Sequence, residues 1–333
     1  MSQLFVCHTQ YNLLLAVGLS SSVDDLVLFI DFNLTDELKK KLEEHFKRCL
    51  FLVGNYPKKE MSAKEKLDKI TSDIQQLKTF ICIYDRIFVV DDMCIQEMYA
   101  LKCAYKKNKS VEMAWLEDGA NAYFSNGVVS GGMGGTSFKR LLRKCFFSLR
   151  FGLYGFYDLA VCMGAHKKLE SAYVTFPDSI RDELRCKKLI KVTEKQFESG
   201  MIFLYSGEKM EFKPGSMIIA LDKLDVYGEK LEIVNQLIKK MIENTTGEIY
   251  YKYHPRESME LPALKDSIQL ERTVALESYL TNSVTKELTV IGIKSTALQT
   301  AKKMGYNAIS LINHVEEAEL VTSFYKSIGI ECP

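Results

Sequence analysis

Two adjacent carboxylates and a glycine, Glu117-Asp118-Gly119, follow the apolar segment 111–116. Mutual repulsion and partial burial raise the pKa of a carboxyl group above its ordinary value of about 4.3, which makes it a better base. Gly119 allows the chain to turn sharply at this point. The pair could therefore remove a proton from a hydroxyl group. The same three residues would also make an ordinary polar turn at the end of a strand.

The segment EIYYKYH (248–254) ends in His254, which is followed by Pro255. The proline keeps the preceding residue extended, so the imidazole is expected to project from the end of a strand. A histidine in this position can donate a hydrogen bond to a phosphate or act as an acid near neutral pH. Lys252 and Arg256 add positive charge beside it. The alternative is an ordinary surface histidine in a turn.

Two more polar groups lie farther along the chain. Ser295 and Thr296 precede an expected helix, and hydroxyl groups with free amides at a helix start form an anion site. They would serve equally as an ordinary helix cap. Glu277 lies in an apolar stretch, where a carboxylate could accept hydrogen bonds from ribose hydroxyls. An exposed acid at a helix start is the simpler interpretation of Glu277.

Short apolar segments that alternate with amphipathic ones position these residues. This alternation is typical of parallel sheets with helices on both faces, where ligands bind outside the carboxyl ends of the strands. The expected strands are 4–8, 26–31, 85–92, 111–116, 216–222, 248–254, 288–293 and 307–312. A first helix is expected to begin near residue 11. Further helices are expected at 34–49, 63–79, 95–106, 229–243 and 296–304.

The length of 333 residues points to two domains. The alternation predicts an α/β protein with two Rossmann-like domains, at 1–165 and 214–333, joined by an irregular interdomain segment at 166–213. Two such domains facing each other would leave a central cleft.

Composition excludes several classes of protein. Lys and Arg number 44 against 43 Asp and Glu, which removes the electrostatic case for a nucleic-acid partner. The nine cysteines include no CxxC pair, so buried thiols in a reducing cytosol are expected rather than disulfides or a zinc site. The amino-terminal segment lacks the basic residues of a signal peptide, and no apolar run reaches the roughly 20 residues of a membrane span. We therefore expect a cytoplasmic protein, or one bound peripherally to the inner membrane face.

The segment 126–137 is rich in glycine and follows the acid pair closely. It lacks the lysine and hydroxyl residue that complete a phosphate-binding loop. A lid or an acceptor-binding loop is predicted, with a plain linker as the alternative. The glycines concerned are Gly131, Gly132, Gly134 and Gly135.

The segment 137–157 contains no acidic residue and combines cations with apolar residues at helical spacing. A basic amphipathic helix of this kind can lie on an anionic membrane or attract an anionic polysaccharide. Packing of its apolar face against the sheet is the alternative, slightly favoured from sequence. The basic residues are Lys139, Arg140, Arg143, Lys144 and Arg150.

An acid-acid-glycine turn in the first half, followed by His-Pro, Glu and Ser-Thr in the second, resembles the bacterial sialyltransferases. These include the lipooligosaccharide sialyltransferases and the capsular polysialyltransferases. His254 precedes Glu277 by 23 residues and Ser295 by 41, and this ordered spacing carries the resemblance. The opening segment, with Thr9-Gln10 after its first strand, also resembles the amino-terminal strand and turn of these families. The resemblance covers most of the chain as architecture, but only a few residues are specific.

The resemblance implies a GT-B fold and inverting transfer of sialic acid from CMP-sialic acid to a hydroxyl of lipooligosaccharide or capsule, without a metal or other cofactor. Glu117 would be the general base, with Asp118 orienting or replacing it, and the pattern leaves the choice open. His254 would bind the donor phosphate and assist the departure of CMP. The first domain would then hold the acceptor and the second the donor.

The resemblance also assigns the supporting residues. The donor-binding residues would be Lys252, His254, Pro255, Glu277, Ser295 and Thr296. The acceptor or lid residues would be Thr9, Gln10, Gly119, Gly131, Gly132, Gly134 and Gly135. Two alternatives stay open: another GT-B enzyme acting on UDP- or GDP-sugars, including an epimerase, and a non-enzymatic membrane-associated capsule assembly protein.

Overall fold

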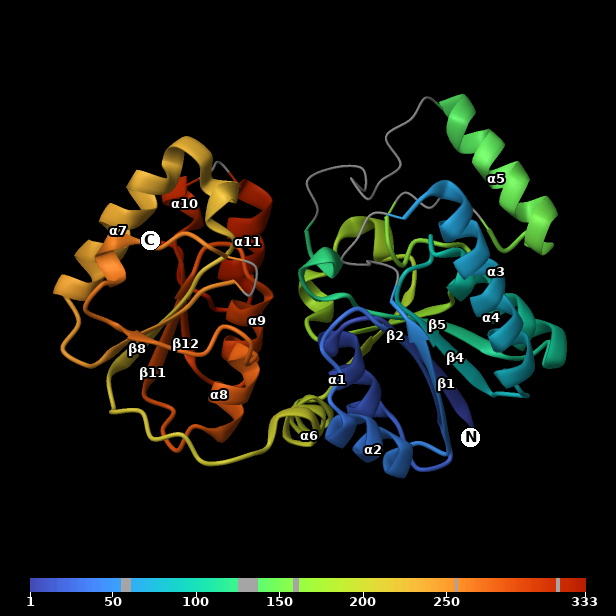
Figure 1. Cartoon of the computed structure of the whole chain (residues 1–333), viewed down its shortest axis with the longest axis horizontal. Helices are drawn as coiled ribbons and strands as arrows, with labels where there is room; N and C mark the ends of the chain where they lie inside the picture. Colours follow the sequence, from blue (N-terminus) through green and yellow to red (C-terminus); the bar gives the residue numbers. More distant parts are fainter. Residues whose placement is uncertain (55–60, 125–136, 158–161, 255–256, 316–317) are drawn as a thin grey trace. The chain divides into compact units, whose positions relative to one another are not determined.

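A computed structural model describes residues 1–54, 61–124, 137–157, 162–254, 257–315 and 318–333 (Figure 1). The chain divides into two compact units, Met1–Gly200 and Met201–Pro333. Each unit contains one parallel sheet. The predicted α/β architecture with two Rossmann-like sheets is therefore confirmed.

The sheet of the first unit has the strand order β3-β2-β1-β4-β5-β6-β7, and every pairing is parallel. Its central strands are almost entirely apolar and buried, as a sheet covered on both faces requires. The strands are β1 (Gln3–Cys7), β2 (Asp25–Ile30), β3 (Arg48–Val53), β4 (Arg86–Val89), β5 (Glu112–Leu116), β6 (Ser171–Val174) and β7 (Lys188–Lys191).

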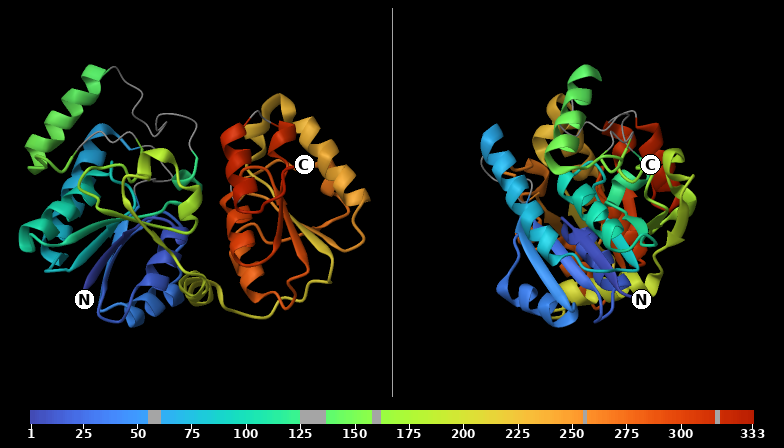
Figure 2. Two further views of the ribbon diagram at one scale, coloured as in Figure 1. Left: turned by 180° about the vertical axis from the view of Figure 1, so that it is seen from behind. Right: turned by 90° about the vertical axis from the view of Figure 1, so that its right-hand side faces the viewer.

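Helices cover both faces of this sheet, with α1 and α2 on one side and α3 and α4 on the other (Figure 1). The α5 helix runs along the outside of the first unit (Figure 2). The helices are α1 (Gln10–Leu19), α2 (Asp36–His45), α3 (Ala63–Phe80), α4 (Ile95–Lys107), α5 (Ser137–Phe151) and α6 (Glu194–Tyr205). Short 3₁₀ turns cover Gly119–Ala122, Pro177–Ser179 and Asp182–Leu184.

The second unit has a sheet of order β10-β9-β8-β11-β12, again with parallel pairing throughout. Its strands are β8 (Ser216–Ala220), β9 (Ile249–Lys252), β10 (Ile268–Gln269), β11 (Leu288–Gly292) and β12 (Asn307–Ser310). Its helices are α7 (Leu231–Glu243), α8 (Leu276–Asn282), α9 (Thr296–Lys303), α10 (Ile312–Val315) and α11 (Glu319–Ser327). Short 3₁₀ segments cover Leu224–Lys230 and Pro262–Leu264.

Two stretches differ from the sequence-based expectation. The helix expected at 34–49 ends at His45, because Phe46 is already extended, and Arg48–Val53 forms β3. The irregular segment expected at 166–213 contains β6, β7 and α6, and the division between the units falls after Gly200. Strands of only four residues are too short for their periodicity to be recognised.

A tight turn at 162–166 returns the chain to the sheet before β6. The backbone amides of Gly164 and His166 donate to the buried Asp92 carboxylate at 3.0 and 2.7 Å. Gly164 has a φ of +82°, and a Cβ on it would lie 2.6 Å from Cδ2 of Trp115. Both the backbone conformation and the contact with the indole therefore require glycine at this position.

We expect Gly164→Ala to lower the free energy of unfolding by more than Gly155→Ala does. Gly155 also has a positive φ, +72°, but a Cβ on it would meet nothing within 4 Å. The control should therefore cost about 1–2 kcal/mol for conformation alone, and Gly164→Ala should cost more because of the clash. Urea denaturation of both variants measures the difference, and equal losses would contradict the role of the Trp115 contact.

Candidate active site

Glu117 lies at the carboxyl end of β5 and is completely buried. Its carboxylate accepts hydrogen bonds from the hydroxyl groups of Tyr11 and Tyr123. It also accepts from the hydroxyl and the backbone amide of Thr175, at 2.7 and 2.8 Å. These donors come from α1, from the turn after β5 and from the end of β6, so one side chain joins three parts of the first unit.

Burial raises the pKa of Glu117, and the hydrogen bonds from Tyr11, Tyr123 and Thr175 oppose this effect by stabilising the charged form. Burial and the nearby Glu117 charge also raise the pKa values of Tyr11 and Tyr123, which keeps both hydroxyl groups protonated as donors. Glu117 thus has the raised pKa expected of a base, but no exposed surface.

Asp118 is half-exposed. Its Oδ1 accepts from the Asn12 side-chain amide at 3.1 Å, and the same amide nitrogen lies 3.2 Å from the Glu117 carbonyl oxygen. Gly119 has a φ of +54° and begins a 3₁₀ turn immediately after the pair. The sharp turn predicted at Gly119 is present, and it leaves Asp118 as the accessible member of the acid pair.

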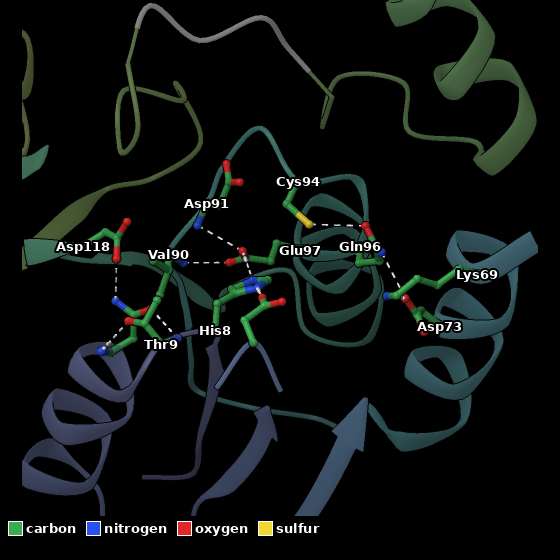
Figure 3. Close-up of polar contacts among 12 residues, drawn as sticks. His8, Thr9, Lys69, Asp73, Val90, Asp91, Cys94, Gln96, Glu97 and Asp118 are labelled. Atoms are coloured by element: carbon green, nitrogen blue, oxygen red, sulfur yellow. Dashed lines mark hydrogen bonds and ion pairs between the residues drawn. The ribbon is translucent and has the colours of Figure 1, made fainter. Parts of the chain in front are cut away.

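A buried ion pair close to the acids was not predicted from the sequence. His8, after β1, places Nε2 2.6 Å from Oε1 of Glu97 on α4, and its ring stacks on Phe29. Glu97 also accepts from the backbone amides of Val90 and Asp91 at 2.7 and 3.0 Å. Figure 3 shows Asp91 and Asp118 on the same side of His8.

Burial acts to lower the pKa of His8, but the charges and hydrogen bonds of Glu97 and Asp31 outweigh it and raise the pKa to about 10. The imidazole is therefore a cation at neutral pH. The one sequence feature that could have pointed to His8 was its position, because it follows an apolar strand as His254 does. Glu97 gave no signal, since an acid in the first turn of a helix is ordinary.

Among the described residues, one trio brings together atoms that a metal could use. Nitrogen, sulfur and oxygen of His8, Cys94 and Glu97 lie within 4.8 Å of one another. The 2.6 Å between His8 and Glu97 is shorter than the roughly 3.3 Å that separates two ligands of a tetrahedral zinc ion with bonds near 2.0–2.1 Å. This spacing is that of an ion pair.

In the second unit, His254 lies half-buried after β9, and its carbonyl accepts from the Glu257 amide at 2.9 Å. Pro255 and its neighbour Arg256 lie outside the described residues. Lys252 is buried, and its ammonium donates to the Arg272 carbonyl at 2.9 Å. The structure therefore directs Lys252 toward the chain before α8.

Glu277 lies half-buried in the first turn of α8. Burial raises its pKa, and the nearby Lys252 charge opposes that effect. The structure thus brings together two residues that were predicted separately for the donor site. Their interaction is electrostatic and lies at the end of the sheet where ligands bind in such folds.

Ser295 is the N-cap of α9, and its hydroxyl accepts from the Ala297 amide at 3.2 Å. Thr296 is the first residue of that helix. The cap interpretation is confirmed, and the first turn of α9 offers its amides at the carboxyl end of β11. Asp222, after β8, was missed by sequence reasoning and lies beside this turn, accepting from the Lys294 amide at 3.3 Å.

Two of the predicted acceptor residues lie at the start of α1. Thr9 is the N-cap of α1 and Gln10 is its first residue. The four glycines of the predicted lid, Gly131, Gly132, Gly134 and Gly135, lie outside the described residues.

The predicted basic segment forms α5. Lys139 and Arg140 belong to it, but their side chains lie outside the described part, whereas Arg143 and Arg150 are exposed and Lys144 is half-buried. Four apolar side chains of α5 do not pack on the sheet, contrary to the interpretation favoured from sequence. Their exposed fractions are Leu141 53%, Leu142 53%, Phe146 49% and Leu149 68%. Within the described residues, no helix combines the length and apolarity needed to cross a bilayer.

Solved structures with a similar pair of sheets include glycosyltransferases. The sialyltransferase GT-B domain from Photobacterium damselae covers 99% of this chain and 98% of its own at 14% identity, with a TM-score of 0.53. The α/β-galactoside α-2,3-sialyltransferase from Photobacterium phosphoreum covers 98% of this chain and 95% of its own at 11% identity, with a TM-score of 0.51. The UDP-GlcNAc 2-epimerase from Methanocaldococcus jannaschii covers 99% of this chain and 88% of its own at 12% identity, with a TM-score of 0.55. Identities this low establish the fold alone, and that fold is GT-B.

The sequence narrows the class. The sequence model of the alpha-2,8-polysialyltransferase family matches residues 38–310. The chain belongs to this family and is a sialyltransferase, which confirms the resemblance found in its motifs. No curated protein sequence matches the chain.

The hydrogen bonds around Glu117 predict a specific loss of stability. Tyr123→Phe removes the hydroxyl that donates to Glu117 and that accepts from the amides of Thr175 and Phe176, both at 3.1 Å. We expect the free energy of unfolding to fall by about 1–3 kcal/mol. Urea denaturation followed by the fluorescence of the single tryptophan, Trp115, measures it. Tyr154→Phe, at a 63% exposed position, is the control, and an equal effect of both variants would refute the network.

Proposed function

We propose that this protein is an inverting, metal-independent sialyltransferase that transfers sialic acid from CMP-sialic acid to a hydroxyl of a cell-surface glycan, lipooligosaccharide or capsule. Membership of the polysialyltransferase family supports the reaction class. The observation that carries the proposal is the half-exposed carboxylate of Asp118, held at the carboxyl end of β5 beside the buried Glu117. A carboxylate in that position can accept the proton of an acceptor hydroxyl.

Asp118 is the general base in this proposal, although the motif alone favoured Glu117. A general base must come within about 2.6–3.2 Å of the proton donor. Glu117 has no exposed surface and already accepts four hydrogen bonds. Its role is then to fix the turn that presents Asp118.

The second unit holds the donor in this proposal. His254 donates a hydrogen bond to the phosphate of CMP, and Ser295 and Thr296 offer hydroxyls and helix amides to the same phosphate. Glu277 accepts from the ribose, and Lys252 balances its charge. Without a metal, these groups stabilise the negative charge of the leaving group.

The reaction is a single displacement. The acceptor oxygen forms a bond to the anomeric carbon of sialic acid while its proton passes to Asp118. The bond from that carbon to the phosphate oxygen breaks, and its electron pair leaves with CMP, assisted by His254. The transition state has oxocarbenium character, as in glycoside hydrolysis.

Replacement of the base and of the phosphate ligand tests the reaction. We expect Asp118→Asn and His254→Ala each to lower the rate of CMP release with acceptor by about 100-fold or more, because the first removes the proton acceptor and the second removes the hydrogen-bond donor to the leaving phosphate. Asp178→Asn changes an exposed acid of the same unit and should retain activity. The wild-type rate should be unaffected by EDTA.

Ligand binding separates this function from its competitors. CMP should raise the melting temperature of the wild-type protein, because it binds the folded state. A shift with UDP or GDP and none with CMP would assign another nucleotide-sugar reaction. Full activity of both Asp118→Asn and His254→Ala would refute the proposed roles.

We also propose that α5 binds the anionic surface of the inner membrane. Its side chains combine exposed Leu142 and Leu149 with exposed Arg143 and Arg150, and the helix contains no acidic residue. Apolar side chains enter the interfacial region while each Lys or Arg adds about 1 kcal/mol of attraction to anionic lipid.

Flotation with liposomes tests this surface. The protein should float with vesicles that contain anionic phosphatidylglycerol, and Leu149→Glu should weaken binding by tenfold or more, since it removes apolar area and adds repulsion. Leu320→Glu, at a 65% exposed position on α11, is the matched control. Equal binding of both variants would refute the role of α5, and binding to anionic glycan alone would reassign it.

A further inference from the structure

The side chain of Asn12 is held in one orientation. Asn12 is completely buried, and its Oδ1 accepts from the backbone amide of Thr9 at 3.1 Å, while the backbone amide of Asn12 donates to the Thr9 hydroxyl at 3.2 Å. The acceptor end of the side chain therefore faces the start of α1. Its Nδ2 then faces the two oxygens beyond, the Glu117 carbonyl and Oδ1 of Asp118.

The segment that precedes Asn12 and the first turn of α1 is held in place by a buried ion pair. His8 precedes Thr9 in the chain and pairs with Glu97, whose carboxylate also accepts the amides of Val90 and Asp91. The loop after β1 is thereby tied to the loop after β4. Movement of the loop after β1 would separate this buried ion pair, and movement of the loop after β4 would remove two hydrogen bonds from the buried Glu97.

The charges around Asp118 come from several elements. Asp91, after β4, interacts electrostatically with it, and burial raises the pKa of Asp91 while the His8 charge opposes that rise. Glu117 is its neighbour in the chain. Asn12 donates a hydrogen bond to Asp118 within this group of acids.

Resting on the proposed role of Asp118 as base, we propose that Asn12 is the positioning residue of that base. Its side-chain amide holds one carboxylate oxygen of Asp118 at 3.1 Å. A hydrogen bond to a carboxylate is stronger than one between neutral groups, so this contact fixes the orientation of the Asp118 side chain. Asn12 does not touch the reacting atoms.

The isosteric variant Asn12→Asp tests the proposal. It keeps an oxygen for the Thr9 amide, so the helix cap is retained, but it replaces the donor to Asp118 with a second carboxylate. We expect kcat to fall about tenfold to 100-fold while KM for the acceptor changes little, because a displaced base slows proton transfer without removing a substrate contact. Asn12→Ala, which adds no charge, should lower kcat in the same way but by less.

Thr35→Ala is the control for lost stability. Thr35 caps α2 in the same unit through the Leu38 amide at 3.2 Å, and removing that cap should destabilise the protein without lowering kcat. The proposal is overturned if kcat in the two Asn12 variants falls no more than in Thr35→Ala, or if KM alone changes.

A second measurement does not depend on activity. In protein carrying ¹³C-labelled aspartate, the Asp118 carboxyl resonance, assigned with Asp118→Asn, should change its chemical shift in Asn12→Ala and in Asn12→Asp, because the carboxylate loses the donor that orients it. An unchanged resonance in both variants overturns the inference. Full activity of Asp118→Asn, with the resonance displaced as expected, would instead refute the proposed base and leave the positioning by Asn12 standing.

Discussion

Glu117 places a carboxylate where water does not reach, and protein groups must supply the hydrogen bonds that water would have given. An unpaired buried charge would cost several kcal/mol. The donors come from α1, from the turn after β5 and from the end of β6, through Tyr11, Tyr123 and Thr175. These three parts must therefore stay together for the fold to be stable. Asp118 is the next residue in the chain and inherits a fixed position from this requirement.

The same principle operates one strand away. Glu97 is a second buried carboxylate, and it is satisfied by a cation, His8, and by two backbone amides at the end of β4. The two buried acids are satisfied differently: hydroxyl groups and an amide surround Glu117, whereas an imidazolium pairs with Glu97. Between them, the loops after β1, β4 and β5 are held without any bound ligand. The Asp118 carboxylate at this edge is thus held in place by the fold alone.

Local sequence patterns predicted what depends on local structure. Apolar strands, Gly119 after the acid pair and the cap at Ser295 follow from short-range chemistry, so they could be recognised. The His8–Glu97 pair joins residues 89 positions apart, and neither residue has a distinctive neighbourhood. The choice of Asp118 over Glu117 as the proposed base depends on burial, which the motif does not reveal. The exposure of Leu149 on α5 likewise depends on what does not pack against the helix.

Parallel pairing throughout both sheets has a consequence for synthesis of the chain on the ribosome. β1 must wait for β4, whose paired residue Arg86 comes 83 positions after Gln3. At 5–20 residues per second this delay is on the order of ten seconds. During that time an almost wholly apolar strand has one lasting neighbour, β2, and an edge open to other nascent chains. Slower folding of such non-local topologies should make yield of this enzyme sensitive to growth temperature and to chaperones that shield β1 until β4 emerges.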